Sequence, residues 1–230
     1  MSKITWDGVG EKRYETGTDR GVLYPTFDKV TNRYTDATAW NGLTGVTENP
    51  SGADSTDIYA DNIKYASIRA AEKFGATIQA YTYPDEFAVL DGSAELTDGV
   101  TIGQQDRGIF GFSYRTLIGD DEKGTESGYK IHLVYGCSVS PSGRDYSTVN
   151  ESPDPIQLSW ELSTTPVPVT GFKPTATLVI DSTRLTAAQL KAIEDVLYGT
   201  DADPEEVGST GTTAYLPLPD EVKSIIDAAA

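Results

Sequence analysis

Residues that could support catalysis are few and scattered in this sequence. His132 is the only histidine and Cys137 is the only cysteine, so a hydrolytic triad and a multi-ligand zinc site both lack their usual components. Both residues fall in one alternating run. We expect His132 to face solvent or an interface, and Cys137 to be a small buried hydrophobe. We therefore predict no enzyme activity, no metal and no other cofactor.

Acidic side chains gather in the turns, where paired carboxylates could bind a cation or cleave a glycoside. The segments DGSAELTDG, GDDEKG and GTDADPEE do not have the ligand spacing of an EF-hand. The adjacent Asp85 and Glu86 fit the start of a short helix, where acids stabilise the N-terminal end. GVGEKR has Arg13 in place of the third glycine of a dinucleotide-binding loop. These motifs indicate solvated loops, although plentiful carboxylates leave a glycosidase open as an alternative.

The charge balance argues against a protein that holds nucleic acid tightly. The 230 residues carry 35 acids against 18 lysines and arginines, for a formal net charge of −17. Nucleic-acid binders neutralise phosphates with basic side chains, and this chain has no basic surplus. The N-terminus shows no apolar signal region, and no apolar run is long enough to cross a bilayer. We expect a protein made in the cytoplasm, with no membrane span.

The elements that must carry these residues are mainly strands. With 13 tyrosines, 22 glycines and 12 prolines, the composition favours β structure with long loops. Alternating patterns predict strands at 76–83, 129–137 and 156–163. The best helix is 187–198, because Thr186 and Gln189 form a capping box in front of it. Further elements are expected as strands over 38–48, 58–59, 63–68, 100–104, 109–117 and 176–180, a turn at Asp61-Asn62, a short helix after Pro84, a polar loop over 119–128 and a short terminal helix from Pro219.

The strand ATIQAYTYPDEF (76–87) poses a question, because both of its faces suit a sheet. Ala76, Ile78, Ala80 and Thr82 are expected to pack on the domain interior. Thr77, Gln79 and Tyr81 lie on the other face, which is polar without being charged. We expect this second face to meet a wet channel or a seam between subunits, with Tyr81 and Tyr83 covered by a further contact.

The chain divides into three parts by composition. Residues 1–36 are expected to form an extended, mostly irregular arm, because glycines and charges interrupt them. This arm carries more apolar and aromatic side chains than a solvated tail would, so we expect it to dock on its own domain or on a neighbour. Residues 37–199 are expected to form the β domain, and 200–230 a flexible loop with a C-terminal segment. The arm residues expected to make contact between subunits are Trp6, Tyr14, Val22, Leu23 and Tyr24.

Four long segments resemble a known family. They are WDGVGEKRYETGTDRGVLYP, ADNIKYASIRAAEKFGATIQAYTYPDEF, VTIGQQDRGIFGFSYRTLIGDD with GYKIHLVYG, and STTPVPVTGFKPTATLVIDS. They look like the major tail protein of long, non-contractile-tailed bacteriophages, and the resemblance runs from about residue 6 to about residue 220. It implies a mainly β fold, a β-sandwich or half-barrel with a flanking helix, whose strands close a barrel across a hexameric ring.

The resemblance also implies a function. Subunits of this family stack as rings into a hollow tail tube that holds the tape-measure protein and later conducts DNA. The partners would be other copies of the chain, the tape-measure protein, and terminator and tail-tip proteins at the ends; the location would be the virion tail, after assembly in the host cytoplasm. Within the 119–128 loop, we expect Asp120, Asp121, Glu122 and Lys123 to connect neighbouring rings.

In such a tube, the net negative charge of the subunit would keep DNA from binding the channel wall. A basic channel wall would hold DNA by releasing counterions, so we expect part of the −17 charge to face inward. Because like-charged subunits repel, salt is expected to favour their assembly. The alternative from a different class is a carbohydrate-binding or adhesin-like β module of a tail tip, for which tyrosine-rich faces would suit sugars.

Overall fold

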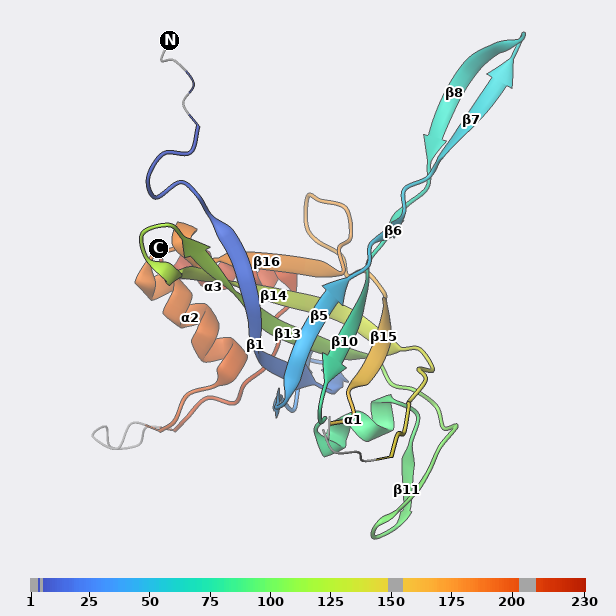
Figure 1. Ribbon diagram of the computed structural model, residues 1–230, viewed down its shortest axis with the longest axis vertical. Coiled ribbons are helices and arrows are strands. Elements are labelled where there is room, and N and C mark those ends of the chain that lie inside the picture. Colours follow the sequence, from blue (N-terminus) through green and yellow to red (C-terminus); the bar gives the residue numbers. More distant parts are fainter. Residues whose placement is uncertain (1–3, 5, 149–154, 203–209) are drawn as a thin grey trace.

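The protein is built around one large, curled antiparallel sheet, seen here in a computed structural model that describes residues 4, 6–148, 155–202 and 210–230. Eight strands form this sheet, in the order β4-β1-β13-β14-β15-β10-β5, with β16 paired to β14 (Figure 1). Their bounds are β1 Tyr14–Tyr24, β4 Thr38–Trp40, β5 Leu43–Glu48, β10 Gly75–Ala80, β13 Phe110–Asp120, β14 Gly124–Val139, β15 Leu158–Thr164 and β16 Thr177–Asp181. The chain is therefore mainly β, as the sequence predicts.

The sheet curls because its two end strands are consecutive in the chain. Only Asn41 and Gly42 separate β4 from β5, and Gly42 adopts a φ of 72°. A side chain there would meet Thr82 Cγ2 at 2.9 Å, so the turn needs glycine. β5 comes into contact with β1, but in the described chain its ladder partner is β10 alone. The sheet is thus an open curl, and a single copy shows no closed barrel.

One apolar cluster fills the inside of the curl. Its centre is aromatic: the ring of Trp40 lies 4.5 Å from that of Phe87 and 5.6 Å from that of Trp160, centroid to centroid. Ala76, Ile78 and Ala80 are buried here, which confirms the interior face predicted for these three residues. Thr82, predicted for the same face, is exposed, because the strand ends at Ala80. The buried members are Leu23, Trp40, Ala76, Ile78, Ala80, Phe87, Leu90, Phe110, Phe112, Tyr114, Val134, Cys137, Val139, Trp160 and Leu162.

A second apolar cluster lies on the other side of β1, β13 and β14, beneath the helices. Its residues alternate along the strands with those of the first cluster, so β14 is buried on both faces. Two helices supply the cover, α2 (Ala187–Tyr198) and α3 (Pro219–Ala228). The buried members are Val22, Tyr24, Tyr34, Ile131, Leu133, Tyr135, Ile180, Ile193, Leu197, Leu216 and Val222.

The helices begin and end where the sequence predicts. Thr186 Oγ1 accepts from the Gln189 amide at 3.3 Å, and the Gln189 side chain accepts from the Thr186 amide at 3.0 Å, which confirms the capping box. Gly199 follows α2 with a φ of 76°. The short helix α1 (Asp85–Leu90) follows Pro84 and buries Phe87 and Leu90. A 3-10 turn, η1 (Ser182–Arg184), links β16 to α2.

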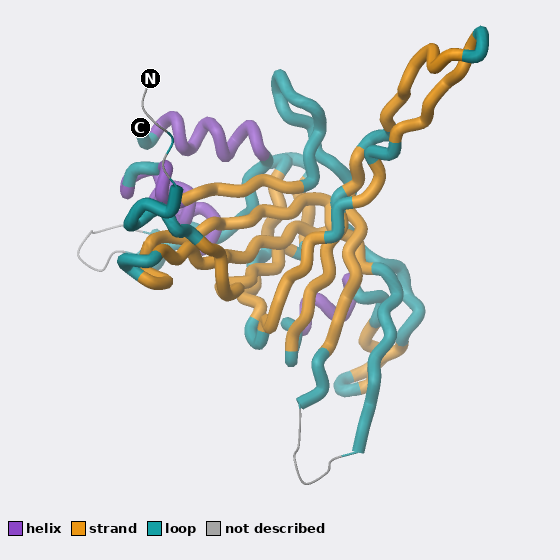
Figure 2. The backbone as a smooth tube through the Cα atoms, turned by 45° about the horizontal axis from the view of Figure 1, so that its top comes forward, coloured by secondary structure: helices purple, strands orange, loops and turns teal. Residues whose placement is uncertain are grey.

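The described chain also forms four two-stranded ladders outside the large sheet. β2 (Thr26–Asp28) pairs with β3 (Arg33–Thr35), and β6 (Ser51–Gly52) pairs with β9 (Glu72–Lys73). β7 (Ser55–Ala60) pairs with β8 (Ile63–Arg69), and β11 (Ala94–Thr97) with β12 (Val100–Ile102). In Figure 2 the β7–β8 ladder stands apart from the body, at the far side from the helices.

Two predicted segments were wrong in secondary structure. Residues 14–24, expected to be irregular, form the long strand β1 between β4 and β13, because Val22, Leu23 and Tyr24 are each buried in an apolar cluster. The loop predicted over 119–128 is a tight hairpin, since β13 runs to Asp120 and β14 starts at Gly124. Part of the loop predicted after residue 200, residues 203–209, lies outside the described residues.

Candidate functional site

The feature that stands out from the fold is the hairpin of β7 and β8, called here the projecting hairpin (residues 55–69). It continues β5 and β10 through the narrow neck of β6 and β9 and rises clear of the body (Figure 1). In the neck, the Ala70 amide donates to the Asp54 carbonyl at 2.9 Å. Backbone pairing thus runs almost continuously from the sheet to the hairpin, so the hairpin is an ordered extension of two core strands.

The hairpin tip is set by a two-residue turn. Asp61 and Asn62 have φ values of 49° and 63°. Positive φ at both central positions matches the turn whose twist suits a hairpin, and Asp and Asn tolerate that conformation. These values confirm the turn that the sequence predicts at Asp61-Asn62.

The two faces of the projecting hairpin differ in chemistry. The register pairs Ile58 with Ala66 and Ala60 with Ile63, which puts their side chains on one face with Ile68. Ile58, Ile63 and Ile68 are 41%, 66% and 59% exposed. Side chains of the opposite face include Asp57 and Lys64, whose charged groups lie 2.7 Å apart. The hairpin is therefore amphipathic, and none of the residues that the structure describes covers its apolar face.

A second distinctive surface covers the outer side of β5, β10 and β15; we call it the hydroxyl face. Its members lie opposite one another across the two ladders and point away from the aromatic cluster. They are mostly hydroxyl or amide side chains, with one carboxylate and no cation, and are half-buried or exposed. The members are Gly45, Thr47, Thr77, Gln79, Ser159, Glu161 and Ser163.

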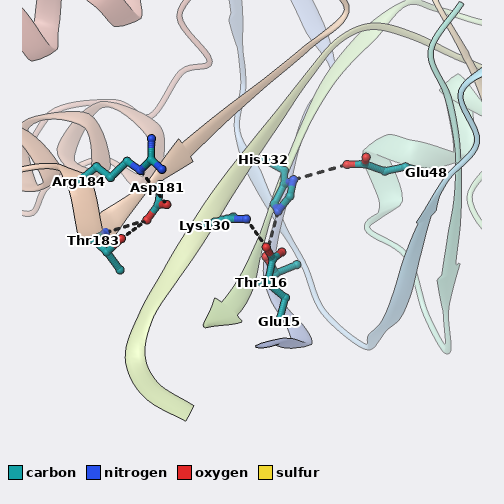
Figure 3. A network of polar contacts seen from close by, with 8 residues as sticks. All are labelled: Glu15, Glu48, Thr116, Lys130, His132, Asp181, Thr183 and Arg184. Atoms are coloured by element: carbon teal, nitrogen blue, oxygen red, sulfur yellow. Dashed lines mark hydrogen bonds and ion pairs between the residues drawn. The ribbon is translucent and has the colours of Figure 1, made fainter. Parts of the chain in front are cut away.

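Glu48, at the end of β5, ties the base of the hairpin to the sheet. It accepts a 2.7 Å hydrogen bond from the Tyr114 hydroxyl, and its Oε1 lies 3.5 Å from Nδ1 of His132 (Figure 3). The Tyr114 and His132 rings stack at 4.5 Å, and Nε2 of His132 lies 3.0 Å from Thr116 Oγ1. The group bridges the open mouth of the curl, just where the chain leaves for the neck.

His132 is buried in this cluster, so the prediction that it faces solvent is wrong. It is 9% exposed, because both of its neighbours on β14 enter apolar clusters and Tyr114 covers its ring. Burial lowers the pKa of His132 more than the nearby Glu48 and Glu15 raise it. The imidazole is therefore neutral near pH 7, and its Nδ1 has no hydrogen-bond partner in the described structure.

A neighbouring charged patch closes the edge of the same sheet face. Lys130 pairs with Glu15, while Asp181 accepts from the Thr183 amide at 2.9 Å and lies 3.7 Å from Arg184 (Figure 3). The Asp181 contacts cap η1 and help to lower the pKa of its carboxyl. These contacts fix β16 and its turn.

The residues predicted for the N-terminal arm fall into two groups. Val22, Leu23 and Tyr24 are 8%, 0% and 0% exposed, and the Tyr24 hydroxyl donates to the Leu197 carbonyl at 2.9 Å. They are core residues of their own chain and cannot form a contact between subunits. Trp6 and Tyr14 are 77% and 47% exposed, so their predicted role stays a prediction.

The residues predicted for a ring-connecting loop form a compact turn. Asp120 is buried and accepts from the amides of Glu122 and Lys123 at 3.0 and 2.6 Å. The Asp121 carboxylate accepts from the Gly10 amide at 2.9 Å. Asp120 thus shapes the turn, and Asp121 holds the chain's own N-terminal segment.

The predicted channel residues are placed together on or next to the hydroxyl face. Thr77 Oγ1 accepts a 2.9 Å hydrogen bond from the Asn49 side chain, and Gln79 is half-buried beside it. Tyr81 follows the end of β10 and is 52% exposed. Tyr83 was expected to be covered by a contact with another subunit. It packs instead against Phe87 and Trp160 of its own core. The projecting hairpin was missed as a site, because Ile63 and Ile68 share a face only through the register shift of the ladder, which alternation does not predict.

Across the described ranges, no group of three or more His, Cys, Asp and Glu side chains could hold a metal ion. No helix in the described chain has the length and apolarity to cross a membrane. No family model matches the chain, and no curated protein matches it. The distinctive surfaces are therefore the projecting hairpin and the hydroxyl face.

Proposed function

We propose that this protein is a structural subunit that assembles with copies of itself into a tube, as the resemblance to phage tail-tube proteins implies. The observation that carries the proposal is the projecting hairpin, which exposes three isoleucines on one face of an ordered ladder. Exposed apolar surface rimmed by polar groups marks an interaction site. A rigid extension with such a face fits a contact between subunits.

The open sheet supports the same proposal. A single copy leaves β5 and β16 each with one ladder partner in the described chain, and free strand edges invite pairing with another chain. A contact between two different surfaces of one protein gives closed rings or continuing filaments. In the proposed assembly, hexameric rings stack and strands from six copies surround the channel.

The hydroxyl face is proposed as the wall of that channel. It carries one carboxylate and no cation, so it would not hold a DNA backbone by counterion release. Its hydroxyl and amide groups stay solvated beside a passing chain, first the tape-measure protein and later DNA. Terminator and tail-tip proteins would close the ends of the tube in the virion, after assembly in the host cytoplasm.

Electron microscopy of the concentrated protein tests the proposal. We expect regular tubes with a central channel, forming more readily at higher salt because the subunits carry like charge. The matched variant Ile63→Lys should leave a folded protein that makes no tubes. Monodisperse particles under all salt conditions would overturn the proposal, and glycan binding by such particles would favour a carbohydrate-binding module instead.

A further inference from the structure

An apolar groove lies between β16 and α3. Its volume is about 450 Å³, within the range of about 300–1,000 Å³ common for pockets that hold ligands. The floor is apolar, and charged residues of both signs stand at the rim. The floor residues are Leu178, Ile180, Leu185, Val222 and Ile226, and the rim residues are Asp181, Arg184, Lys223 and Asp227.

The strand that borders this groove has a free edge. The Tyr135 amide donates to the Ala176 carbonyl at 2.9 Å, and the antiparallel register alternates from there. The backbone groups of Val179 consequently point away from β14. In the part of the chain that the structure describes, β16 has no other ladder partner. The groove therefore combines apolar side chains with open backbone hydrogen-bonding groups, the pairing that an added strand uses.

We propose that this groove receives the tip of the projecting hairpin from a second copy of the chain. The inference rests on the proposed self-assembly and names the acceptor surface. Ile58 and Ile63 share the apolar face near the tip, and Ile63 lies opposite Ala60, two residues beyond Ile58. The two isoleucines are thus about 7 Å apart along the hairpin. α3 residues from Pro219 to Asp227 line the groove, a helical length of about 12 Å, so both isoleucines fit.

The charges at the two surfaces also match. Lys64 is paired with Asp57 on the hairpin, which leaves Asp61 as the charge at the turn. The groove rim offers two cations, with Arg184 84% exposed at its side chain. In a chain with 35 acids and 18 basic residues, an average surface would repel Asp61. The groove rim holds two cations and two acids, so Asp61 can lie next to a cation there.

The contact must join different copies. The hairpin rises on the β5 and β10 side of the molecule, whereas α3 lies at the opposite side (Figures 1 and 2). One copy cannot bend its own hairpin back over the sheet to reach its own groove. A hairpin-to-groove contact is therefore head-to-tail, the type that closes a ring or extends a filament.

Disulfide formation between two variants of the full chain, each with one added cysteine, tests the inference. Native Cys137 is fully buried, so it does not compete. Ile63→Cys is mixed with Lys223→Cys, whose position is exposed at the groove. The matched controls are Tyr59→Cys, on the opposite hairpin face, and Ser224→Cys, exposed on α3 outside the groove. We expect about tenfold more crosslinked heterodimer from the first pair than from the control pair, because docking raises the local concentration.

The outcomes separate the two proposals. Tubes that form without excess 63–223 crosslinking would overturn the groove as acceptor and leave the proposed function intact. Preferential crosslinking of Trp6→Cys to Lys223→Cys would assign the groove to the N-terminal segment and also overturn the inference. A protein that stays monomeric at all concentrations would overturn both.

Discussion

β10 and β8 share a sequence pattern but differ in their surroundings. Both interleave apolar and polar residues, and both lie in antiparallel ladders, but the β7–β8 ladder has a register shift between Ile58 and Tyr59 that the β10–β15 ladder lacks. Ile78 of β10 is fully buried among aromatic rings, whereas Ile63 of β8 is 66% exposed. The register of each ladder thus fixes which residues share a face. It does not tell what covers that face, and in β8 we propose that another copy covers it.

The largest effect is expected where the apolar face is covered within the chain. Trp160→Ala removes a side chain that packs against Trp40, Tyr83 and Phe87, and loses its 3.3 Å hydrogen bond to Asp91. We expect the free energy of unfolding to fall by about 3–5 kcal/mol, as measured by urea unfolding. A loss under about 1 kcal/mol would show that the aromatic cluster does not stabilise the curl.

Substitution on the exposed apolar face of the projecting hairpin should weaken assembly and leave stability almost unchanged. Ile63→Lys should change the unfolding free energy by no more than about 0.5 kcal/mol, because the side chain is exposed. It should weaken assembly about a hundredfold, ~2.7 kcal/mol, because a charge enters the centre of a contact. Light scattering across a concentration series measures this loss.

Tyr59→Lys is the matched control for that substitution. Tyr59 is 68% exposed, like Ile63, but lies on the polar face of the same hairpin. It should assemble as the unmodified chain does. Equal losses in both variants would remove the distinction between the hairpin faces.

Much of the fold could be predicted from local patterns, whereas the sites could not. The capping box of Thr186 and Gln189 and the Asp61-Asn62 turn act within a few residues, so the sequence predicts them correctly. β1 was missed because its glycines and charges hide a strand that long-range contacts stabilise, with Tyr24 bonded to Leu197. His132 was misplaced for the same reason: its burial depends on Tyr114 and Glu48, from two other strands. The exposure of Ile63 follows from the neck, which no periodicity predicts.

The base of the hairpin should be sensitive to acid. Burial holds the pKa of His132 below its ordinary value of 6.5, so the folded protein resists a proton that the unfolded chain accepts. The contribution of His132 to the free energy of unfolding is therefore highest above pH 6.5. It falls as the pH drops below 6.5, because the unfolded chain takes up a proton at His132 before the folded protein does. His132→Gln should therefore flatten the decline in unfolding free energy on acidification.

Urea unfolding of both proteins across this pH range measures the difference in slope. Glu48, Glu15 and Lys130 act on the charge of the imidazole and are present in both proteins, so the two proteins differ at residue 132 alone. Parallel slopes would mean that His132 does not resist protonation in the folded state.

The smallest effect on stability is expected at the hydroxyl face, which contrasts with the interior face of the same strand. Gln79→Lys should alter the unfolding free energy by no more than about 0.5 kcal/mol, whereas Ile78→Lys, one residue away, would bury an unpaired charge and unfold the domain. If the hydroxyl face lines a wet channel, Gln79→Lys should still form tubes, since the added ammonium group stays solvated. Loss of tubes with unchanged monomer stability would instead place Gln79 in a dry seam between subunits. Microscopy of this one variant therefore decides whether the polar side of β10 meets the channel or a neighbour.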